Sequence, residues 1–255
     1  MFVLAIGQAP ADLEAPLAWL EEALPQVAQS GADMLLLPEL FACGYNIGAA
    51  VRERAEAADG PIAMVVAALA KAHGVAIHYG YAEQGGSRIF NAAQCFGPDG
   101  ARLGHQRKLT LPPGYERAHF SAGQGVGQFA YRGLRFATLI CYDAEFPETA
   151  RHAAVMGAQV LLVPTALGAQ WGWVSDVLIP ARAYENGVFL AYANGAGSQN
   201  GMEFLGRSFV AGPDGAEVAR AGAAPQILLA EIDPARITAA QTRLPYLIDR
   251  RNLTL

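Results

Sequence analysis

The chain is poor in charge. Only 16% of its 255 residues are charged, against 53% hydrophobic residues, and the formal net charge is −5. Neither sign forms long runs, so the sequence offers no basic surface to the phosphates of a nucleic acid or to anionic lipid. We therefore expect neither a nucleic-acid nor a membrane partner. A chain of this length and hydrophobicity is expected to bury the core of one α/β domain spanning 1–255.

Cysteine is also scarce. Cys43, Cys95 and Cys141 are odd in number and widely spaced, which favours reduced thiols in the cytoplasm over a disulfide framework. The N-terminal stretch MFVLAIGQAP has no basic region and soon turns polar, so it is interpreted as a first strand and not as a signal peptide. No apolar run approaches the roughly 20 residues that a membrane span requires.

Two kinds of cofactor site are missing from the pattern. The five histidines never stand beside another ligand type at HxxH, HxxxH or CxxC spacing, so no metal site is predicted. The glycine-rich SAGQGVGQ at 121–128 precedes a strand pattern and not a helix, which is the wrong context for dinucleotide phosphates. We interpret it as the joint between two halves of the chain and expect no cofactor.

Helix and strand patterns alternate from the start. Leucines at steps of three and four predict an amphipathic helix over 13–28. The run DMLLLPE, ended by Pro38, is typical of a strand buried on both faces. A second helix is predicted to start near Pro61 and to end at Gly74. The strand VAIHYGYAE follows, and then a hairpin with a Pro-Asp-Gly turn in AAQCFGPDGARLGHQRK.

The second half of the chain repeats this order. GADMLLLPEL at 31–40 is echoed by GAQVLLVPTA at 157–166, and HGVAIHYG at 73–80 by NGVFLAYA at 186–193. Each repeat presents a sheet with helices on one side only. Stacking the two sheets with the helices outside gives a four-layer α-β-β-α sandwich, which is the fold we predict. A single doubly wound sheet is the competing architecture.

Cys141 stands between a strand pattern, LRFATLI, and a helix pattern, FPETARHAAVMGA. The thiol is therefore expected near the carboxyl end of a strand with a helix N-terminus close by. That end favours a thiolate and can hold a developing oxyanion. The competing interpretation is an inert core cysteine, since free cysteines are among the most often buried residues.

Two charged residues occupy equivalent places. Glu39 ends the first buried run, and Lys108 ends a strand of the hairpin. Because ligand crevices of α/β sheets lie at the carboxyl ends of the strands, both are expected to converge with Cys141. A carboxylate can accept the thiol proton and a lysine can stabilise an oxyanion. A buried ion pair without a catalytic role is the alternative.

Three segments together resemble a known family. LLLPELFACGY, HQRKLTLPPGYERAHFSAG and LICYDAEFPE stand in the order found in the nitrilase, or carbon-nitrogen hydrolase, superfamily, and the resemblance runs from residue 3 to about 251. It implies the α-β-β-α fold and a Glu-Lys-Cys triad. Glu39 would be the general base, Cys141 the nucleophile that forms a thioester, and Lys108 with the backbone N–H of Tyr142 the oxyanion site. Glu116 matches a second glutamate that supports the lysine or positions substrate.

The tripeptide CYD resembles the amidase branches, whereas family nitrilases usually carry CWE. We predict hydrolysis of a small primary amide, with an N-carbamoyl amidase or a nitrilase as alternatives. Glu145 stands where the ω-amidase branch has an arginine, which favours a substrate with a basic amine over one with a carboxylate. Alternatively, Glu145 pairs with Arg151 or Arg182.

Other site residues are predicted from their positions after strand ends. Aromatic side chains there are candidates for pocket walls, with core packing as the alternative; they are Tyr45, Tyr142, Phe146, Trp171 and Trp173. Asn194 either reaches substrate or forms an Asn-Gly turn. The resemblance implies a homodimer or higher oligomer, formed through the helices after the nucleophile and the C-terminal segment.

Two functions of other classes compete with the hydrolase. A non-catalytic interaction subunit has no need of an intact Glu39, Lys108 and Cys141. A dinucleotide-binding enzyme requires a glycine fingerprint between a strand and a helix, and the sequence has none in that context.

Overall fold

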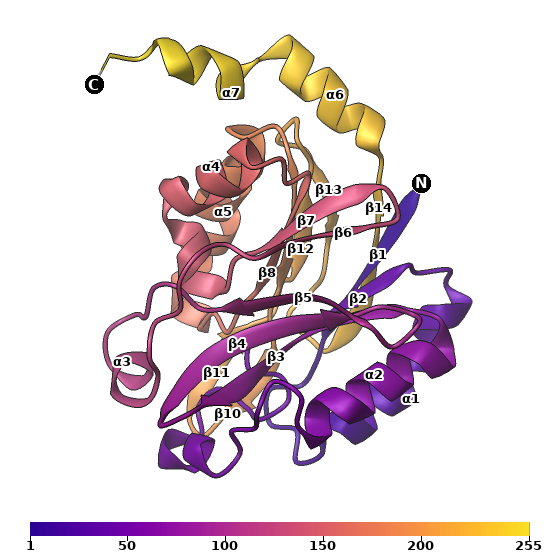
Figure 1. The fold of residues 1–255 in the computed structure, drawn as a ribbon, viewed down its shortest axis with the longest axis vertical. Coiled ribbons are helices and arrows are strands. Elements are labelled where there is room, and N and C mark those ends of the chain that lie inside the picture. Colours follow the sequence, from indigo (N-terminus) through magenta and orange to yellow (C-terminus); the bar gives the residue numbers. More distant parts are fainter. Residues whose placement is uncertain (255) are drawn as a thin grey trace.

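Two six-stranded mixed sheets are stacked in the computed structural model, which describes residues 1–254 (Figure 1). The first sheet has the order β14 (Gln226–Ile232), β1 (Phe2–Gln8), β2 (Met34–Leu36), β3 (Ala76–Gly85), β4 (Arg88–Phe96) and β5 (Arg102–Arg107). The second has the order β13 (Glu217–Arg220), β12 (Phe209–Ala211), β9 (Phe189–Ala193), β8 (Val160–Pro164), β7 (Leu134–Thr138) and β6 (Gln128–Tyr131). A separate hairpin pairs β10 (Ala196–Gln199) with β11 (Met202–Leu205).

The two sheets have the same plan. Three central strands are parallel, β1, β2 and β3 in one sheet and β7, β8 and β9 in the other, and two antiparallel strands follow on one side. The predicted repeat is therefore confirmed, and the four-layer sandwich is the fold. A single doubly wound sheet, the competing prediction, is wrong.

Helices cover the outer face of each sheet. The first sheet carries α1 (Pro16–Gln29) and α2 (Pro61–His73), and the second carries α4 (Pro147–Val155) and α5 (Ile179–Tyr184) (Figure 1). The buried stripe of α1, Leu20, Leu24 and Val27, packs in one cluster with the outward side chains of β2 and β3. The helix predicted from residue 13 begins at Pro16, because proline fits the first turn of a helix.

The remaining helical elements are short or peripheral. They are η1 (Gly48–Arg52), α3 (Tyr115–His119), η2 (Cys141–Glu145), η3 (Ala169–Trp171), η4 (Val174–Leu178), α6 (Pro234–Arg243), α7 (Tyr246–Asp249) and η5 (Arg250–Asn252). Figure 1 places α6 and α7 beyond one end of the sandwich. Within residues 1–254, no helix combines the length and the hydrophobicity that a membrane crossing demands.

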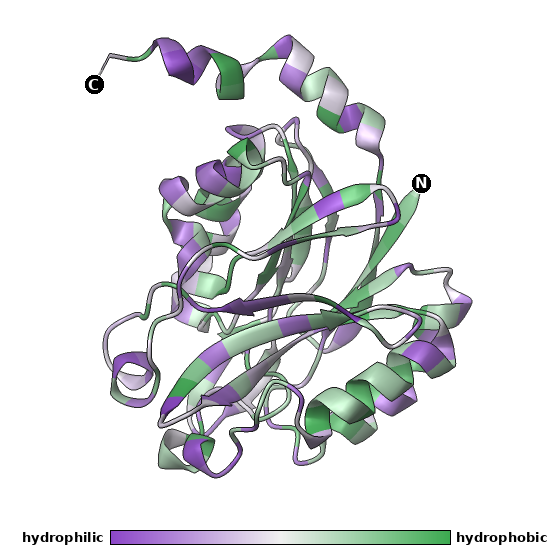
Figure 2. Cartoon of the chain, in the orientation of Figure 1, coloured by the Kyte–Doolittle hydropathy of each residue, from purple (hydrophilic) through white to green (hydrophobic). Residues whose placement is uncertain are grey.

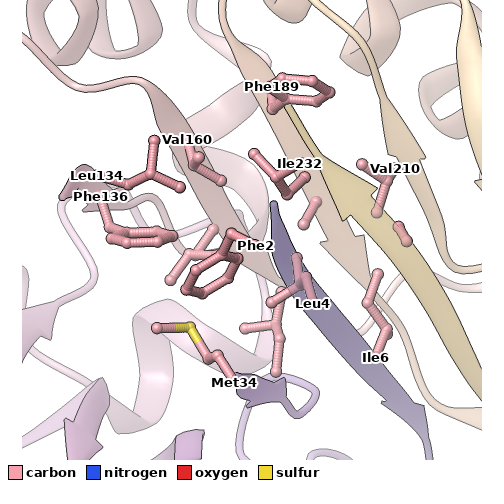
Figure 3. Close-up of a cluster of buried hydrophobic side chains, with 14 of the residues drawn as sticks. Phe2, Leu4, Ile6, Met34, Leu134, Phe136, Val160, Phe189, Val210 and Ile232 are labelled. Carbon is pink, nitrogen blue, oxygen red and sulfur yellow. The ribbon is translucent and has the colours of Figure 1, made fainter. Parts of the chain in front are cut away.

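The main core lies between the two sheets. Phe2, Leu4 and Ile6 of β1 meet Phe136 of β7 and Val160 of β8, all with little or no exposed surface (Figure 3). The rings of Phe2 and Phe136 lie 5.3 Å apart, centroid to centroid. Figure 2 shows hydrophobic residues along much of the central strands, whereas the helices carry both hydrophobic and hydrophilic residues. Apolar burial between the sheets therefore sets their mutual position.

Strand ends from both sheets meet at one edge of the sandwich. After β2 the chain turns at Pro38, and the Glu39 N–H donates to the carbonyl of Thr165, which follows β8, over 3.4 Å. Gly80 of β3 lies beneath this turn, where a Cβ atom would stand only 2.4 Å from the backbone nitrogen of Leu40. The absence of a side chain at Gly80 thus permits the backbone approach that carries Glu39 inward.

The glycine-rich segment 121–128 joins the halves, as predicted, between α3 and β6. It runs against the outer strand of the first sheet: a Cβ on Gly123 would lie 2.5 Å from the carbonyl oxygen of Arg107, and one on Gly127 equally close to that of His105. Close backbone packing therefore explains these glycines.

Candidate active site

A buried lysine joins two carboxylates at this edge. Lys108, which follows β5, donates from Nζ to Oε1 of Glu39 over 2.7 Å and to Oε1 of Glu116 over 2.6 Å. All three side chains are completely buried. Glu116 lies on the short helix α3 and is buried there. Unlike a surface ion pair, a pair buried this deeply must be satisfied by fixed partners, because water cannot replace them.

Two further residues complete the partners of these carboxylates. Asn91 on β4 donates from Nδ2 to Oε1 of Glu39 over 2.7 Å and to Oε2 of Glu116 over 3.3 Å. The hydroxyl of Tyr45 donates to Oε1 of Glu116 over 2.8 Å. Oε2 of Glu39 is buried and accepts no hydrogen bond from any described residue. In the carboxylate of Glu39, Oε1 therefore accepts from two donors, while Oε2 accepts from none of the described residues.

Cys141 is brought to this cluster by the second sheet. It is the first residue of η2, directly after the extended Ile140 that prolongs β7, and it has a φ of 48°. Non-glycine residues seldom adopt that backbone conformation, which turns the chain sharply and presents the side chain at the strand end. Cys141 as a whole is 8% exposed and packs against Ala93 of β4. The nucleophile candidate thus touches the strand that carries Asn91.

The cluster shifts the ionisation of its members. Burial raises the pKa of Glu39 to about 7, and Glu116 adds to the effect, although Lys108 and Asn91 oppose it. Burial lowers the pKa of Lys108, but Glu39, Cys141 and Glu116 outweigh it, so that the pKa of Lys108 lies above its ordinary value. The lysine is therefore a cation at neutral pH, while Glu39 is poised between its two forms.

The pKa of Cys141 is also raised, first by burial and then by the Glu39 carboxylate, and the opposing influence of Lys108 is smaller. The prediction that a helix N-terminus favours a resting thiolate is wrong. The helix α4 begins only at Pro147, after η2, whereas burial and a carboxylate act on the sulfur directly. The thiol is protonated at neutral pH and needs a base to become a nucleophile.

Asp143 links the lysine segment to the cysteine turn. Its buried carboxylate accepts hydrogen bonds from the backbone N–H groups of Leu109, Thr110 and Ile140, at 2.8 to 3.2 Å. Burial raises the pKa of Asp143 to about 6, against these hydrogen bonds and the nearby Lys108. The residue after Lys108 and the residue before Cys141 are thereby held by one side chain.

Three more of the predicted residues follow Cys141 in the chain. Next to Cys141, the rings of Tyr142 and Phe146 lie edge to face with centroids 4.9 Å apart. The carboxylate of Glu145 forms no ion pair with any described residue, and Arg182 instead binds the backbone carbonyls of Ala144 and Glu145 and the side chain of Glu185. The predicted alternative in which the Glu145 side chain pairs with Arg151 or Arg182 is therefore wrong.

Asn194 has a structural position. It is buried, its Oδ1 accepts from the N–H groups of Leu167 and Gly195, and its Nδ2 donates to the carbonyls of Leu167 and Gly206. These bonds occupy both ends of the amide, so the prediction that Asn194 reaches substrate is corrected: it orders the loop after β9. Trp171 and Trp173 are 56% and 69% exposed, which excludes the predicted alternative of core packing for both.

A narrow cavity of about 30 Å³ adjoins the cluster. Glu39, Tyr45 and Thr165 line it together with mostly apolar groups, among them Phe41 and Phe204. The hydroxyl of Thr165 donates to the hydroxyl of Tyr192 over 3.1 Å and lies near enough to Cys141 to lower the pKa of its thiol. Within residues 1–254, no group of three or more His, Cys, Asp and Glu side chains is placed to hold a metal ion.

The arrangement can support acyl transfer. An unengaged carboxylate oxygen near a protonated thiol serves as a base. Lys108 has three N–H bonds and donates two of them to carboxylates, which leaves one for an oxyanion. The N–H of Tyr142 precedes the first hydrogen bond of η2, which Asp143 donates to the carbonyl of Ile140, so it too is placed for an external acceptor. Of this machinery, Asn91, Asp143 and Thr165 were not predicted from the sequence.

Comparisons with known proteins point the same way. A sequence model of the carbon-nitrogen hydrolase family matches residues 3–242. A protein of Pseudomonas protegens described as a hydrolase in the pqqF 5' region is 42% identical over 233 residues, 89% of this chain and 82% of that protein. An (R)-stereoselective amidase of a Pseudomonas species is 34% identical, with 86% and 80% of the two chains covered.

The solved structures that the chain resembles include a variant of the amidase from Nesterenkonia sp. AN1. The two are 32% identical, with a TM-score of 0.85 over 98% of this chain and 94% of that one. That structure shows covalent addition of the acetamide moiety of fluoroacetamide at the active-site cysteine.

Proposed function

The chain belongs to the carbon-nitrogen hydrolase family, and we propose that it is a thiol amidase that converts a small primary amide into a carboxylic acid and ammonia. As a member of that family it is a hydrolase of carbon–nitrogen bonds other than peptide bonds. The observation that carries the proposal is the convergence of Glu39, Lys108 and Cys141 from opposite sheets, with Glu39 also lining a cavity.

In the first half of the reaction, Oε2 of Glu39 accepts the thiol proton as Sγ of Cys141 attacks the amide carbon. The electron pair of the carbonyl moves to oxygen, and the resulting oxyanion is held by the free N–H of Lys108 and by the N–H of Tyr142. The intermediate collapses, the carbon–nitrogen bond breaks, and Glu39 returns its proton to the leaving nitrogen. Ammonia departs and the acyl group remains on sulfur as a thioester.

In the second half, Glu39 accepts a proton from water as the water oxygen attacks the thioester carbon. The same two donors hold the second oxyanion. The carbon–sulfur bond then breaks, the acid leaves, and the sulfur regains a proton from Glu39. A base must accept and release a proton in each half, and a carboxyl group with a pKa of about 7 is suited to both at neutral pH.

Glu116 is proposed to keep Lys108 in place and charged without touching the reacting atoms. It receives one N–H of the ammonium, and Tyr45 and Asn91 fix it in turn. With Glu116 and Glu39 each accepting one N–H, the third N–H of Lys108 has a defined direction. This geometry supports a positioned donor for the oxyanion.

For the substrate, we propose an amide of few atoms that carries a basic amine. The small cavity favours a short acyl chain. Glu145 ends the η2 segment that starts with the nucleophile, is half-buried, and has no cationic partner within residues 1–254. Burial raises its pKa, although Lys108 and Arg182 oppose the effect. A substrate ammonium would supply the missing opposite charge.

The test is a screen for ammonia release from primary amides, nitriles and N-carbamoyl compounds, with Cys141→Ala as the inactive control. We expect primary amides to be the best substrates and β-alaninamide to exceed succinamate in kcat/KM. Glu145→Gln should reduce that ratio by about tenfold, the effect of losing roughly 1.4 kcal/mol of charge interaction. Preference for a nitrile or an N-carbamoyl compound would assign the alternative chemistry, and preference for succinamate would refute the role of Glu145.

We further propose that two copies associate through the surface formed by α4, α5 and α7. Apolar side chains are exposed there, Val155 and Met156 at the end of α4, Tyr184 on α5 and Ile248 on α7. The rings of Tyr184 and Tyr246 lie 6.1 Å apart, so α5 and α7 form one surface. Exposed apolar surface of this kind favours self-association. Light scattering after size-exclusion chromatography should give at least twice the monomer mass, and Met156→Glu should lower it.

A further inference from the structure

Asn91 occupies the centre of the site but takes no part in the chemical steps proposed above. It lies on β4, and Ala93, two residues along on the same face of the strand, packs against Cys141. The side chain is completely buried. A polar amide in such a place needs partners, and its partners are the two carboxylates of the cluster.

The orientation of the amide is determined by those partners. Its Nδ2 points at Oε1 of Glu39 and Oε2 of Glu116, while its Oδ1 is buried and has no hydrogen-bond donor among the described residues. The reverse orientation would set the amide oxygen against two carboxylates. The geometry therefore favours contact with the acids even though the amide acceptor is left unsatisfied, which ordinarily destabilises a fold.

The contact with Asn91 makes the two carboxylate oxygens of Glu39 differ. Oε1 receives both Lys108 and Asn91 at 2.7 Å, and these donors together prevent the carboxyl group from rotating to exchange its oxygens. Oε2, without a partner, is the oxygen free to accept a proton. If Asn91 were absent, only Lys108 would restrain Oε1, and Lys108 also has to serve Glu116 and the oxyanion.

We propose that Asn91 is a positioning residue for catalysis: by holding Oε1 of Glu39 it assigns proton transfer to Oε2, and by contacting Glu116 it keeps the two carboxylates at a fixed separation around Lys108. The inference rests on the proposed amidase function, since it presumes that Glu39 is the base. It also gives a role to a buried amide whose oxygen has no partner among the described residues.

The chain contains a matched control on the same strand. Gln94 is a buried amide of β4 whose Nε2 donates to the hydroxyl of Tyr79 over 2.7 Å and whose Oε1 likewise has no partner within residues 1–254. Replacing Gln94 by leucine removes a buried amide from β4 without touching the carboxylates. Asn91→Leu and Gln94→Leu therefore differ in whether Glu39 loses a donor.

The experiment compares these variants in two assays, the pH profile of amide hydrolysis and the rate at which iodoacetamide alkylates Cys141. Asn91→Leu should lower kcat on the order of 10- to 100-fold, as expected for a lost hydrogen bond to a charged group, with little change in KM. Its rate of alkylation at pH 7 should fall, and the acid limb of both profiles should move to higher pH, because a donor that favours the charged form of Glu39 is gone. Gln94→Leu should leave the limb in place.

Asn91→Asp, which keeps the size of the side chain, is the second variant in case the leucine variant does not fold. Its added negative charge should move the acid limb further in the same direction. An unmoved limb in either folded variant, or the same change in Gln94→Leu, would overturn the proposal. Full activity in Glu39→Gln would instead refute the amidase mechanism itself, whatever the result for Asn91.

Discussion

Replacing Glu39 by glutamine tests the base directly. The glutamine amide would retain an Oε1 acceptor for Lys108 and Asn91, so the surrounding hydrogen bonds can persist while the proton acceptor at Oε2 is lost. An ordinary thiol with a pKa of about 8.5 is only about 3% ionised at pH 7, and burial raises the pKa of Cys141 further. Without the base, attack depends on this small ionised fraction.

We therefore expect kcat at pH 7 to fall about 100- to 10,000-fold, the usual contribution of a positioned general base. The assay is ammonia release between pH 5 and 10 from a primary amide, at saturating concentration for kcat and well below KM for kcat/KM. In the unmodified enzyme Glu39 must be ionised to act, so kcat/KM should rise with pH and reach half its maximum near pH 7. In Glu39→Gln that limb should vanish, and the activity left should increase into the alkaline range as the thiol ionises alone.

The variant should remain folded, with a far-UV spectrum and a urea midpoint close to those of the parent. Retention of more than a tenth of kcat at pH 7, or an acid limb that persists near pH 7 in the folded variant, would refute the assignment of Glu39 as the base.

Two further substitutions test how the site is held. Lys108→Met leaves Glu39 and Glu116 buried without a cation, so the free energy of unfolding at pH 8 should fall by about 3–5 kcal/mol. The loss should be smaller at pH 5, where the carboxyl groups can be protonated. Urea titrations at both pH values measure it, and an equal loss at pH 5 and pH 8 would contradict this reasoning. Gly80→Ala places a methyl group against the backbone that carries Glu39, and should cost about 1–3 kcal/mol in urea unfolding together with activity. Gly172→Ala, which meets no atom within 4 Å, is its control, and equal effects of the two would contradict the packing argument.

The fold was predictable because the local hydrophobic periodicity and the internal repeat of the sequence both indicate it. Buried runs such as MLLL, helices bounded by Pro61 and Gly74, and a Pro-Asp-Gly hairpin each identify an element from a few adjacent residues. The convergence of Glu39, Lys108 and Cys141 was predictable as well, since each ends a strand pattern. Local pattern was less informative at helix starts, where Pro16 and not Leu13 begins α1.

The supporting residues were not predictable, for physical reasons. Asp143 binds Leu109 across 34 residues, and Asn91 reaches Glu39 across 52; such partners depend on how the two sheets are placed and leave no mark on neighbouring sequence. Asn91 directly precedes the hairpin pattern that begins at Ala92, where its amide is indistinguishable from an exposed polar residue. The ionisation of Cys141 was misjudged because position relative to a helix is local, whereas burial depends on the whole fold.

The contributions of the two halves to the site are unequal. The half that begins with β1 bears the base, the cation and the second carboxylate, and the opposite sheet bears the sulfur. The spacing between acid and sulfur is thus a property of the interior, determined by rings such as Phe2 and Phe136 that never meet a reactant. Replacing such a ring by a smaller side chain would let the two sheets shift relative to each other. Because that shift changes the distance between acid and sulfur, kcat would then report on packing in the interior.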